Sequence, residues 1–416
     1  MRRALGDAAG AVSGAQAFDV VIAGVSARAL AESAAMAGLR VAAVDAYGDV
    51  DLATCAHAVA LRRDLGLRYS ADAAAEAAER LDAAAAAYVS NIENHPAALE
   101  RLAAGRTLLG NGPAVLARVR DPLLVARALR ARGFEVPAVR ASAVRAGAVR
   151  TTTGSLMWLR KPRRSGGGHG ITTWAPGMPL TRAAYLQAWI DGQPGSISFV
   201  ADGRRAVPLG LSIQLIGDRA FGVAGFRYCG SLLAGGPVPL FDEQDRLARA
   251  ALALAQAVAE EFGVVGLNGI DFVARGGIPW PVEVNPRYAA SMELVERAHG
   301  VSLFALHAAA CAGTLPATNP YLRPLAHTFG KAVVFAEEGM VARPMRRWLR
   351  DGSVRDVPHP GERIGAGEPI CTVFAQGADA ESCRGRLVRR AAAVRAAQMR
   401  AGGDTRRGGR MRRSVA

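Results

Sequence analysis

The residues with the clearest chemical potential lie in one short stretch, 266–287, which reads GLNGIDFVARGGIPWPVEVNPR. Two apolar segments joined by a Gly-Gly turn predict a β-hairpin here. Because side chains alternate between the two faces of a strand, Glu283 and Asn285 lie on one face of the second strand. Asp271 on the first strand can join them, and Arg287 continues the same alternation. The pattern predicts a polar site on one face of the hairpin.

This polar set predicts a divalent metal site. Carboxylate and amide oxygens are hard ligands, so we expect Asp271, Glu283 and Asn285 to hold Mg2+, with Mn2+ as an alternative. Waters and substrate phosphates would complete the coordination. The Arg287 guanidinium is predicted to act in catalysis by binding a transferring phosphoryl group or an oxyanion. The simpler interpretation is the exposed polar face of a hairpin, which explains poorly why two acids and an amide converge beside Pro286.

A lysine and a glycine-rich loop stand in the segment 158–174, WLRKPRRSGGGHGITTW. A strand ends at Lys161, and we predict that the backbone N–H groups of the following loop approach oxyanions closely while Lys161 supplies a point charge for phosphates. A mobile hairpin loop is the alternative. The P-loop pattern is absent because no GK[ST] follows, and His169 is expected to face solvent. The predicted ATP contacts in the loop are Ser165, Gly166, Gly167, Gly168 and Gly170.

The rarity of lysine strengthens the interpretation of Lys161. Lysine occurs only at positions 161 and 331, so 49 of the 51 basic residues are arginine. A lysine that persists in such a background suggests a role that the wide, planar guanidinium cannot copy.

A third segment, YLQAWIDG at 185–192, is an apolar strand that runs into a glycine turn. About 20 residues after a phosphate loop, it could be a hinge whose backbone reads an adenine edge. Gln187, Trp189 and Ile190 are the candidate residues of such a hinge, with ordinary strand packing as the alternative.

The elements that position these residues begin with a βαβ unit at 18–46. An apolar strand, a turn at 24–26 and an Ala-rich helix lead to a second strand that ends at Asp45. This pattern opens a parallel, doubly wound sheet. The GxGxxG fingerprint is missing, so a nicotinamide cofactor is poorly supported. A further Ala-rich helix is expected over 71–90.

Later segments predict two more structural units. Asp121 is a plausible N-cap with Pro122 at the first helical position, and from about 150 short strands with Gly and Thr indicate an α+β domain. The other predicted elements are a short strand and turn at 105–113, helices at 121–132, 242–261 and 379–400, and a small β-rich module over 331–337 and 357–377.

Composition limits the possible functions. No apolar run approaches the ~20 residues of a membrane-spanning helix, and no secretory signal is expected. The net charge of the chain is +15. Six arginines and one aspartate lie in the segment 399–416, which is predicted to be a disordered tail, and they account for +5 of this charge. The other basic residues do not alternate with aromatic residues as they do in a groove that binds single-stranded nucleic acid. This favours anionic small molecules over nucleic acid as the binding partners of the basic surface. Five dispersed cysteines without a CxxC favour a cytoplasmic protein.

In this order and spacing, the motifs resemble the ATP-grasp superfamily, carboxylate–amine ligase type, over roughly residues 18–375. The resemblance implies an α/β fold with a Rossmann-like N-terminal domain, an ATP-grasp α+β core and a small C-terminal β module. It matches Lys161 to a phosphate-contacting lysine and 187–190 to the adenine hinge. It also matches the hairpin acids and amide to magnesium ligands, and Arg287 to a substrate or transition-state arginine.

Two positions depart from the pattern of the family. Many members have an Asp-Lys pair near 121 whose lysine contacts ATP, where this chain has Asp121 and Pro122. The hinge often carries a glutamate pair, where this chain has Gln187 and Ala188. Both changes concern the nucleotide contacts and not the fold. The segment 331–377 is similar to the C-terminal module of carboxylase-like members, but there is no Met-Lys-Met biotinylation site.

The resemblance implies an ATP- and Mg2+-dependent carboxylate–amine (or carboxylate–thiol) ligase that acts through an acyl phosphate. The start of the chain and the hairpin are also similar to a subgroup of methylotrophs and methanogens linked to one-carbon coenzyme biosynthesis, with an amine–glutamate ligase as one member. An ATP-grasp kinase or carboxylase-like enzyme and an inactive nucleotide-binding regulator are the alternatives. The expected partners are a small carboxylate and an amine, without nucleic acid or membrane, in a monomer or homodimer.

The expected domain boundaries follow from these patterns. They are a disordered start at 1–17, a Rossmann-like domain at 18–120, an ATP-grasp core at 121–325 with a loop subdomain at about 150–192 and a metal-site subdomain at about 193–325, a β-rich module at 326–380, a helix at 381–400 and a disordered basic tail at 401–416.

Overall fold

The computed structural model describes residues 17–142, 150–151, 154–155, 157–235, 238–317, 325–350 and 352–399. The expected disordered tail lies outside these residues, as does the expected disordered start apart from Ala17. Within the described part of the chain, no helix is long and apolar enough to cross a membrane.

The N-terminal domain is built on a five-stranded parallel sheet in the order β3-β2-β1-β4-β5. Strand order reverses beside β1, so the loop after β1 opens at the carboxyl edge, where open α/β sheets place their ligands. The strands are β1 Phe18–Ala23, β2 Val41–Asp45, β3 His57–Ala60, β4 Ala83–Tyr88 and β5 Thr107–Leu109. The helices are α2 Arg28–Met36, α3 Leu61–Leu65, α4 Ala71–Glu79 and α5 Pro96–Ala103.

The predicted single helix over 71–90 is wrong. Helix α4 ends at Glu79, and the run AAAAAY at 83–88 forms strand β4 between β1 and β5. Alanine favours helix, but tertiary packing overrides a propensity of less than 1 kcal/mol per residue. Ala86 and Ala87 are fully buried, because a central parallel strand is covered on both faces.

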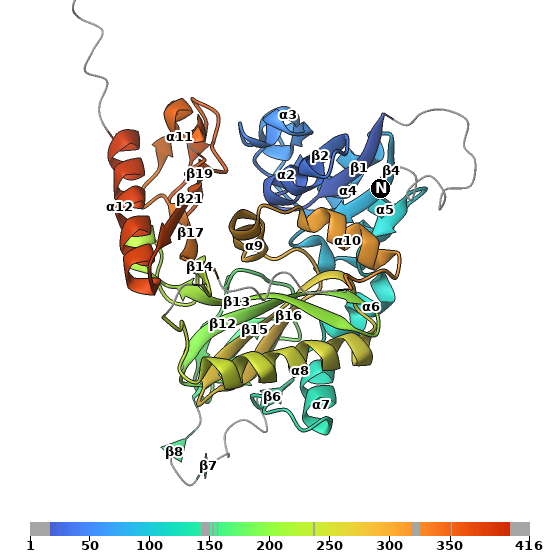
Figure 1. Ribbon diagram of the computed structural model, residues 1–416, viewed down its shortest axis with the longest axis vertical. Helices are drawn as coiled ribbons and strands as arrows, with labels where there is room; N and C mark the ends of the chain where they lie inside the picture. The colour runs from blue at the N-terminus through green and yellow to red at the C-terminus, as the bar shows by residue number, and fades with distance from the viewer. Residues whose placement is uncertain are drawn as a thin grey trace, which may run out of the picture.

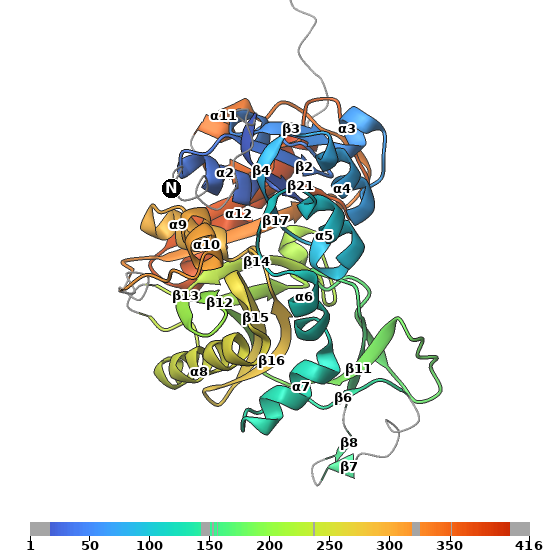
Figure 2. The same ribbon diagram turned by 90° about the vertical axis from the view of Figure 1, so that its right-hand side faces the viewer.

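The core contains two antiparallel sheets, the larger one with eight strands and the smaller one with four (Figures 1 and 2). The large sheet runs β16-β15-β12-β13-β14-β17-β21-β19, so the C-terminal strands continue the core sheet through the pair β14 and β17. Its strands are β12 Gln193–Asp202, β13 Ala206–Ile216, β14 Tyr228–Leu233, β15 Val265–Arg275, β16 Ile278–Asn285, β17 Thr328–Phe335, β19 Val354–Arg355 and β21 Pro369–Gly377.

The smaller sheet has the order β10-β9-β11-β6 and lies near helix α7 (Figure 2). Its strands are β6 Val139–Arg140, β9 Trp158–Pro162, β10 Thr172–Trp174 and β11 Ala184–Ala188. Two further two-stranded pairs join β7 Arg150–Thr151 to β8 Gly154–Ser155 and β18 Met340–Val341 to β20 Arg363–Ile364.

Several predicted helices are confirmed within a few residues. Asp121 caps α7, where its carboxylate accepts hydrogen bonds from two backbone N–H groups, and Gly133 follows the helix with φ +83°. The helices of the core and C-terminal region are α6 Pro113–Val119, α7 Pro122–Ala131, α8 Gln244–Phe262, α9 Met292–His299, α10 Leu303–Cys311, α11 Arg346–Arg350 and α12 Ala380–Met399.

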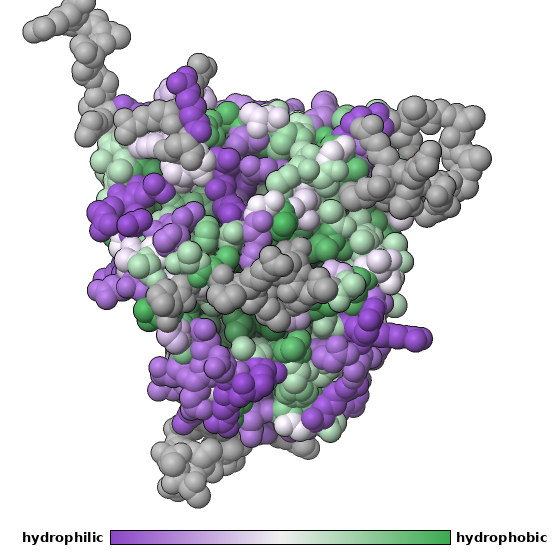
Figure 3. Space-filling view, in the orientation of Figure 1, coloured by the Kyte–Doolittle hydropathy of each residue, from purple (hydrophilic) through white to green (hydrophobic). Residues whose placement is uncertain are grey.

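Three parts of the chain surround a common centre. The N-terminal domain and the C-terminal strands β17 and β21 stand above the core strands β12, β13, β15 and β16, with α9 between them (Figure 1). Hydrophilic side chains gather over helix α12 and over much of helix α8 on the face shown in Figure 3. The predicted site residues lie on strands of the two core sheets and on the loops that follow these strands.

Candidate active site

The hairpin predicted from the sequence is present as β15 and β16, joined by a turn at Gly276 and Gly277. Its register places Asp271 directly opposite Glu283, and Gly269 opposite Asn285. Directly opposed residues of an antiparallel pair share a face. The two acids and the amide therefore lie on one face, as their alternation predicted.

Burial and mutual repulsion make the two acids unequal. Burial and the neighbouring charge of Glu283 raise the pKa of Asp271 to about 7. Burial also opposes ionisation of Glu283, but the positive charges of Arg120 and Lys161 outweigh it and lower the pKa of Glu283. Two like charges held this close share a proton more readily than either acid would alone.

Hydrogen bonds hold the acids and the amide in place. Asp271 accepts from Gln214 Nε2 at 2.8 Å and from Asn285 Nδ2 at 3.0 Å. The Asn285 Oδ1 in turn accepts from Arg287 Nη2 at 3.2 Å, while Arg287 Nε pairs with Glu93 at 2.7 Å. The Arg287 guanidinium is thus fixed beside the acids.

The hairpin fits a magnesium ion by its donor chemistry. Among the described residues, no group of three His, Cys, Asp or Glu side chains is placed to hold a metal. The set here has two carboxylates and one amide oxygen, all hard donors, on one face of the hairpin. Magnesium commonly takes one or two carboxylates from the protein and the rest of its ligands from water and phosphates.

Lys161 lies on β9 and is buried, with 7% of its surface exposed. Its ammonium donates to Gln187 Oε1 at 3.1 Å and to the carbonyl of Val282 at 3.3 Å. It thus bridges the small sheet to strand β16 of the β15–β16 hairpin.

The glycine-rich loop after β9 folds back onto the core. The carbonyl of Gly167 accepts a hydrogen bond from the backbone N–H of Tyr228 at 3.1 Å. A Cβ on Gly168 would lie 1.8 Å from the carbonyl oxygen of Phe226, so only glycine fits at this approach. His169 is exposed at the loop tip, as predicted.

The predicted hinge follows β11. Gln187 is buried and its amide also donates to the carbonyl of Val282 at 3.3 Å. Trp189 is 38% exposed and packs edge-on against Phe226, with ring centroids 5.9 Å apart. Ile190 comes next in the chain at the edge of the small sheet.

The site contains two hollows. The first, here called the intersheet pocket, lies between the small sheet and the β15–β16 hairpin and has a largely apolar wall. It is lined by Val119, Arg120, Pro122, Val125, Ala126, Val136, Val139, Lys161, Pro162, Arg163, Ser165, Gly168, Ile171, Tyr185, Gln187 and Pro281–Val284.

The second hollow, here called the reaction cavity, has a volume of about 360 Å3. It collects all the predicted catalytic and metal residues and two of the predicted loop glycines at one place. Those in its wall are Lys161, Gly167, Gly168, Asp271, Glu283, Asn285 and Arg287. The remaining predicted loop and hinge residues, Gly166, Gly170, Trp189 and Ile190, do not line either hollow, and Ser165 and Gln187 line only the intersheet pocket.

Arg120 is a site residue that the sequence interpretation missed. It directly precedes Asp121, where many relatives of the suspected family place a lysine just after the aspartate. Its guanidinium donates to Glu283 Oε1 at 2.8 Å and to the carbonyl of Ser165 at 3.3 Å. A basic residue next to the unusual Asp-Pro pair was the available signal.

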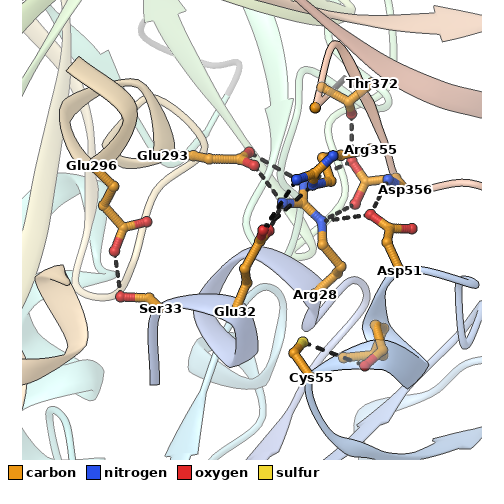
Figure 4. Close-up of polar contacts among 12 residues, drawn as sticks. Arg28, Glu32, Ser33, Asp51, Cys55, Glu293, Glu296, Arg355, Asp356 and Thr372 are labelled. Atoms are coloured by element: carbon orange, nitrogen blue, oxygen red, sulfur yellow. Dashed lines mark hydrogen bonds and ion pairs between the residues drawn. The ribbon is translucent and has the colours of Figure 1, made fainter. Parts of the chain in front are cut away.

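The opposite wall of the reaction cavity holds a second missed group, the Arg28 cluster (Figure 4). Arg28, 1% exposed, bonds to Asp356 at 2.8 Å and to Glu293. Lys331, the other lysine of the chain, binds Glu293 at 2.6 Å. Both lysines therefore line the same cavity. The cluster comprises Arg28, Glu32, Asp51, Glu293, Lys331, Arg355 and Asp356.

Comparison with known proteins identifies the central part of the chain. Residues 119–291 match the ATP-grasp domain family. Over 121 residues, the chain is 28% identical to an uncharacterised protein from Methanocaldococcus jannaschii. That match covers 29% of this chain and 28% of the relative, so the chain spans much less than two thirds of that protein.

Solved structures share the fold over most of the chain. An L-amino acid ligase from Bacillus licheniformis has a TM-score of 0.62 at 12% identity, covering 91% of this chain and 98% of that one. N5-carboxyaminoimidazole ribonucleotide synthetase from Thermus thermophilus gives 0.61 at 18% identity, with coverages of 91% and 98%. A biotin carboxylase from Campylobacter jejuni gives 0.66 at 15% identity, with coverages of 89% and 90%.

Proposed function

From the ATP-grasp domain that this chain carries, we propose that the protein is an ATP- and Mg2+-dependent ligase that joins a carboxylate to an amine. One observation carries the proposal. Lys161, the glycine-rich loop, the acidic hairpin and Arg287 all line a single cavity of about 360 Å3. Such a cavity brings phosphate-binding, metal-binding and oxyanion-binding groups to the same reacting atoms.

The nucleotide would occupy both hollows. The apolar intersheet pocket suits the adenine ring, with its edge beside Gln187 on β11, which lines that pocket. The phosphates of the nucleotide would then bind Lys161 and the backbone N–H groups of the glycine-rich loop. Arg120 would take the position of the positive charge that the Asp121-Pro122 pair omits, because it already lies between Ser165 and Glu283.

Asp271, Glu283 and Asn285 would hold the magnesium ion. When bound, the ion would neutralise charge on the phosphates during transfer. Arg287, fixed by Glu93 and Asn285, would bind the oxygens of the transferring group. These residues do little covalent chemistry, since phosphoryl transfer depends mainly on positioning and charge stabilisation.

The proposed reaction has two balanced steps. A carboxylate oxygen of the acid attacks the γ-phosphorus of ATP, and the bond to the bridging oxygen breaks to release ADP. The resulting acyl phosphate is then attacked at carbon by a neutral amine. An amide forms, inorganic phosphate leaves, and the amine loses one proton.

The test is ADP release over a matrix of carboxylic acids and amines, with amide formation followed by mass spectrometry. We expect release to require both an acid and an amine. Glu283→Gln should lower turnover by about 100-fold or more and raise the magnesium requirement, because one ligand charge is lost. Glu260→Gln, an exposed change on helix α8, is the matched control and should keep wild-type turnover.

The same matrix separates the alternatives. ADP release with an acid alone and a stable phosphorylated product would indicate a kinase, and release that requires bicarbonate would indicate a carboxylase-like enzyme. Nucleotide binding without ADP release on any pair would contradict an enzymatic role and indicate a regulator.

The finer parts of the proposal concern substrate and assembly. A role in one-carbon coenzyme biosynthesis rests on the subgroup resemblance of the sequence alone. Mn2+ as an alternative ion, thiols as alternative nucleophiles and a homodimer belong to the same proposal. Light scattering of the purified chain tests the dimer, and genomic neighbours test the pathway.

A further inference from the structure

A second cavity, here called the side cavity, opens beside the reaction cavity and has a volume of about 540 Å3. It lies between the N-terminal domain and the C-terminal strands. The two cavities share part of their walls and therefore adjoin each other. The shared residues are Ser26, Ser90, Gly167, Tyr228, Val333, Asp356 and Thr372.

The side cavity has an apolar body and charged edges. Phe335 and Ile370 are buried in its wall beside the half-buried Pro369, and they offer a surface for a hydrocarbon group. At the edge of this cavity, Arg62 pairs with Glu368 at 3.1 Å. Arg227, near the glycine-rich loop, lies over the Phe335 ring at 5.1 Å, and within the described part of the chain its Nε has no hydrogen-bond partner.

Asp49 is the exception among the acids of this wall. It is 5% exposed, and among the described residues its Oδ2 has no hydrogen-bond partner. The other three aspartates around it all have donors. Asp45 accepts from three backbone N–H groups, Asp51 from two, and Asp356 from Arg28 and Thr372.

A buried carboxylate without a donor is unfavourable unless a ligand or a proton compensates it. Burial raises the pKa of Asp49 well above its usual range, and the negative charges of Asp356, Asp45 and Asp51 add to this effect. Asp356 has the largest effect of these neighbours and lies in the walls of both cavities. The position thus favours a positive charge at the junction of the two cavities.

We propose that the amine partner of the ligase enters the side cavity as an ammonium ion bound to Asp49, with an apolar body against Phe335 and Ile370. This inference rests on the proposed ligase function and names the class of its nucleophile, a primary amine with a hydrocarbon or aromatic substituent. Before attack the ammonium gives one proton to the Asp49 carboxylate, which leaves a neutral amine and a carboxylic acid. No other reactant is needed for that step.

The test compares matched pairs of probes on the full chain by calorimetry. The pairs are 2-phenylethylamine with 2-phenylethanol and hexylamine with hexanol, which differ in charge and hardly in size. The wild-type protein should bind at least one amine about tenfold or more tightly than its alcohol, since a charge-assisted hydrogen bond discriminates by this order. Asp49→Asn should bind the amine and the alcohol equally.

Two controls separate binding from folding. Glu368→Gln removes a charge from the same wall at a carboxylate that Arg62 already pairs, so the preference for amines should remain. Asp49→Asn should keep or slightly raise the melting temperature, because it removes a buried carboxyl that lacks a donor. A large loss of stability would assign Asp49 a structural role and overturn the proposal.

Two results of the binding experiment would also overturn the inference. One is wild-type protein that binds no amine more tightly than its matched alcohol. The other is Asp49→Asn protein that keeps the wild-type preference. ATP binding and acid-dependent ADP release are measured separately on the same variants. Amine selectivity without any ADP release would refute the ligase and leave the side cavity as an amine site.

Discussion

At the scale of single residues, Lys161 gives the sharpest prediction. Its ammonium fits between Gln187 and the carbonyl of Val282, in a chain that otherwise uses arginine almost everywhere. The wider guanidinium of Lys161→Arg would displace the phosphates by about 1 Å, which costs on the order of 100-fold in rate. We expect turnover to fall by that factor and ATP affinity to weaken, with an unchanged melting temperature without nucleotide.

Steady-state kinetics and calorimetry with ATP check this prediction. Arg160→Lys, the opposite exchange at the neighbouring position of β9, is the matched control and should behave like wild type. Wild-type kinetics in Lys161→Arg would show that the ammonium has no specific role and would leave the glycine-rich loop as a connector.

Some site residues could be predicted from local pattern, and others could not. The hairpin residues Asp271, Glu283 and Asn285 follow from strand alternation and one short turn. Arg120 and Asp49 do not follow from any local pattern. Arg120 meets Glu283 across 163 positions of the chain, and the importance of Asp49 comes from the donors that it lacks.

At the scale of elements, the glycine-rich loop depends on its contact with the segment before β14. Gly168 has φ +75° and leaves no room for a Cβ against the Phe226 carbonyl. Gly168→Ala should lift the loop away from the core and weaken ATP binding by about tenfold or more. The expected effect on global stability is small, because few residues move. Fluorescence titration with a labelled nucleotide measures the affinity.

Gly385→Ala is the control for this substitution. Gly385 lies within helix α12, where alanine should be neutral or slightly stabilising. Equal ATP affinity in Gly168→Ala and wild type would contradict the assignment of the loop to phosphate binding.

Helices and strands were predicted correctly where the spacing of the apolar residues had one clear period. The βαβ start, helices α7, α8 and α12, and the β15–β16 hairpin were all predicted with nearly the right bounds. The alanine run at 83–88 failed because alanine carries no information about which face is buried. Only its position between β1 and β5 makes it a strand.

At the scale of the whole molecule, the Arg28 cluster joins three separate parts of the chain. Arg28 comes from the N-terminal domain, Glu293 from helix α9 and Asp356 from the C-terminal region (Figure 4). Arg28→Gln would leave several buried carboxylates without their cation, and breaking such a network typically costs about 3–5 kcal/mol. We expect urea unfolding to show that loss and a separate, earlier transition for the N-terminal domain.

Arg205→Gln tests whether the effect depends on burial. Arg205 is 69% exposed and pairs with Asp202 at 3.3 Å, so its loss should change the free energy of unfolding by less than about 0.5 kcal/mol. A similar small change in Arg28→Gln would show that the cluster does not hold the parts together.

The continuity of the core with the C-terminal strands could not be read from the sequence. The segment 331–337 was expected in a separate small module, yet β17 pairs with β14 and extends the eight-stranded sheet. Strand partners across 100 positions follow from the whole fold and not from local pattern. This continuity brings Lys331 to the cavity that also holds Lys161.

The most direct test of the central claim follows an oxygen atom. Once the matrix of acids and amines has identified a productive pair, the acid is supplied with 18O in its carboxylate, and the released phosphate is examined by mass spectrometry. An acyl phosphate intermediate transfers one carboxylate oxygen to phosphate, so the account predicts one 18O atom per phosphate and one in the amide. Amide formation with unlabelled phosphate would contradict it.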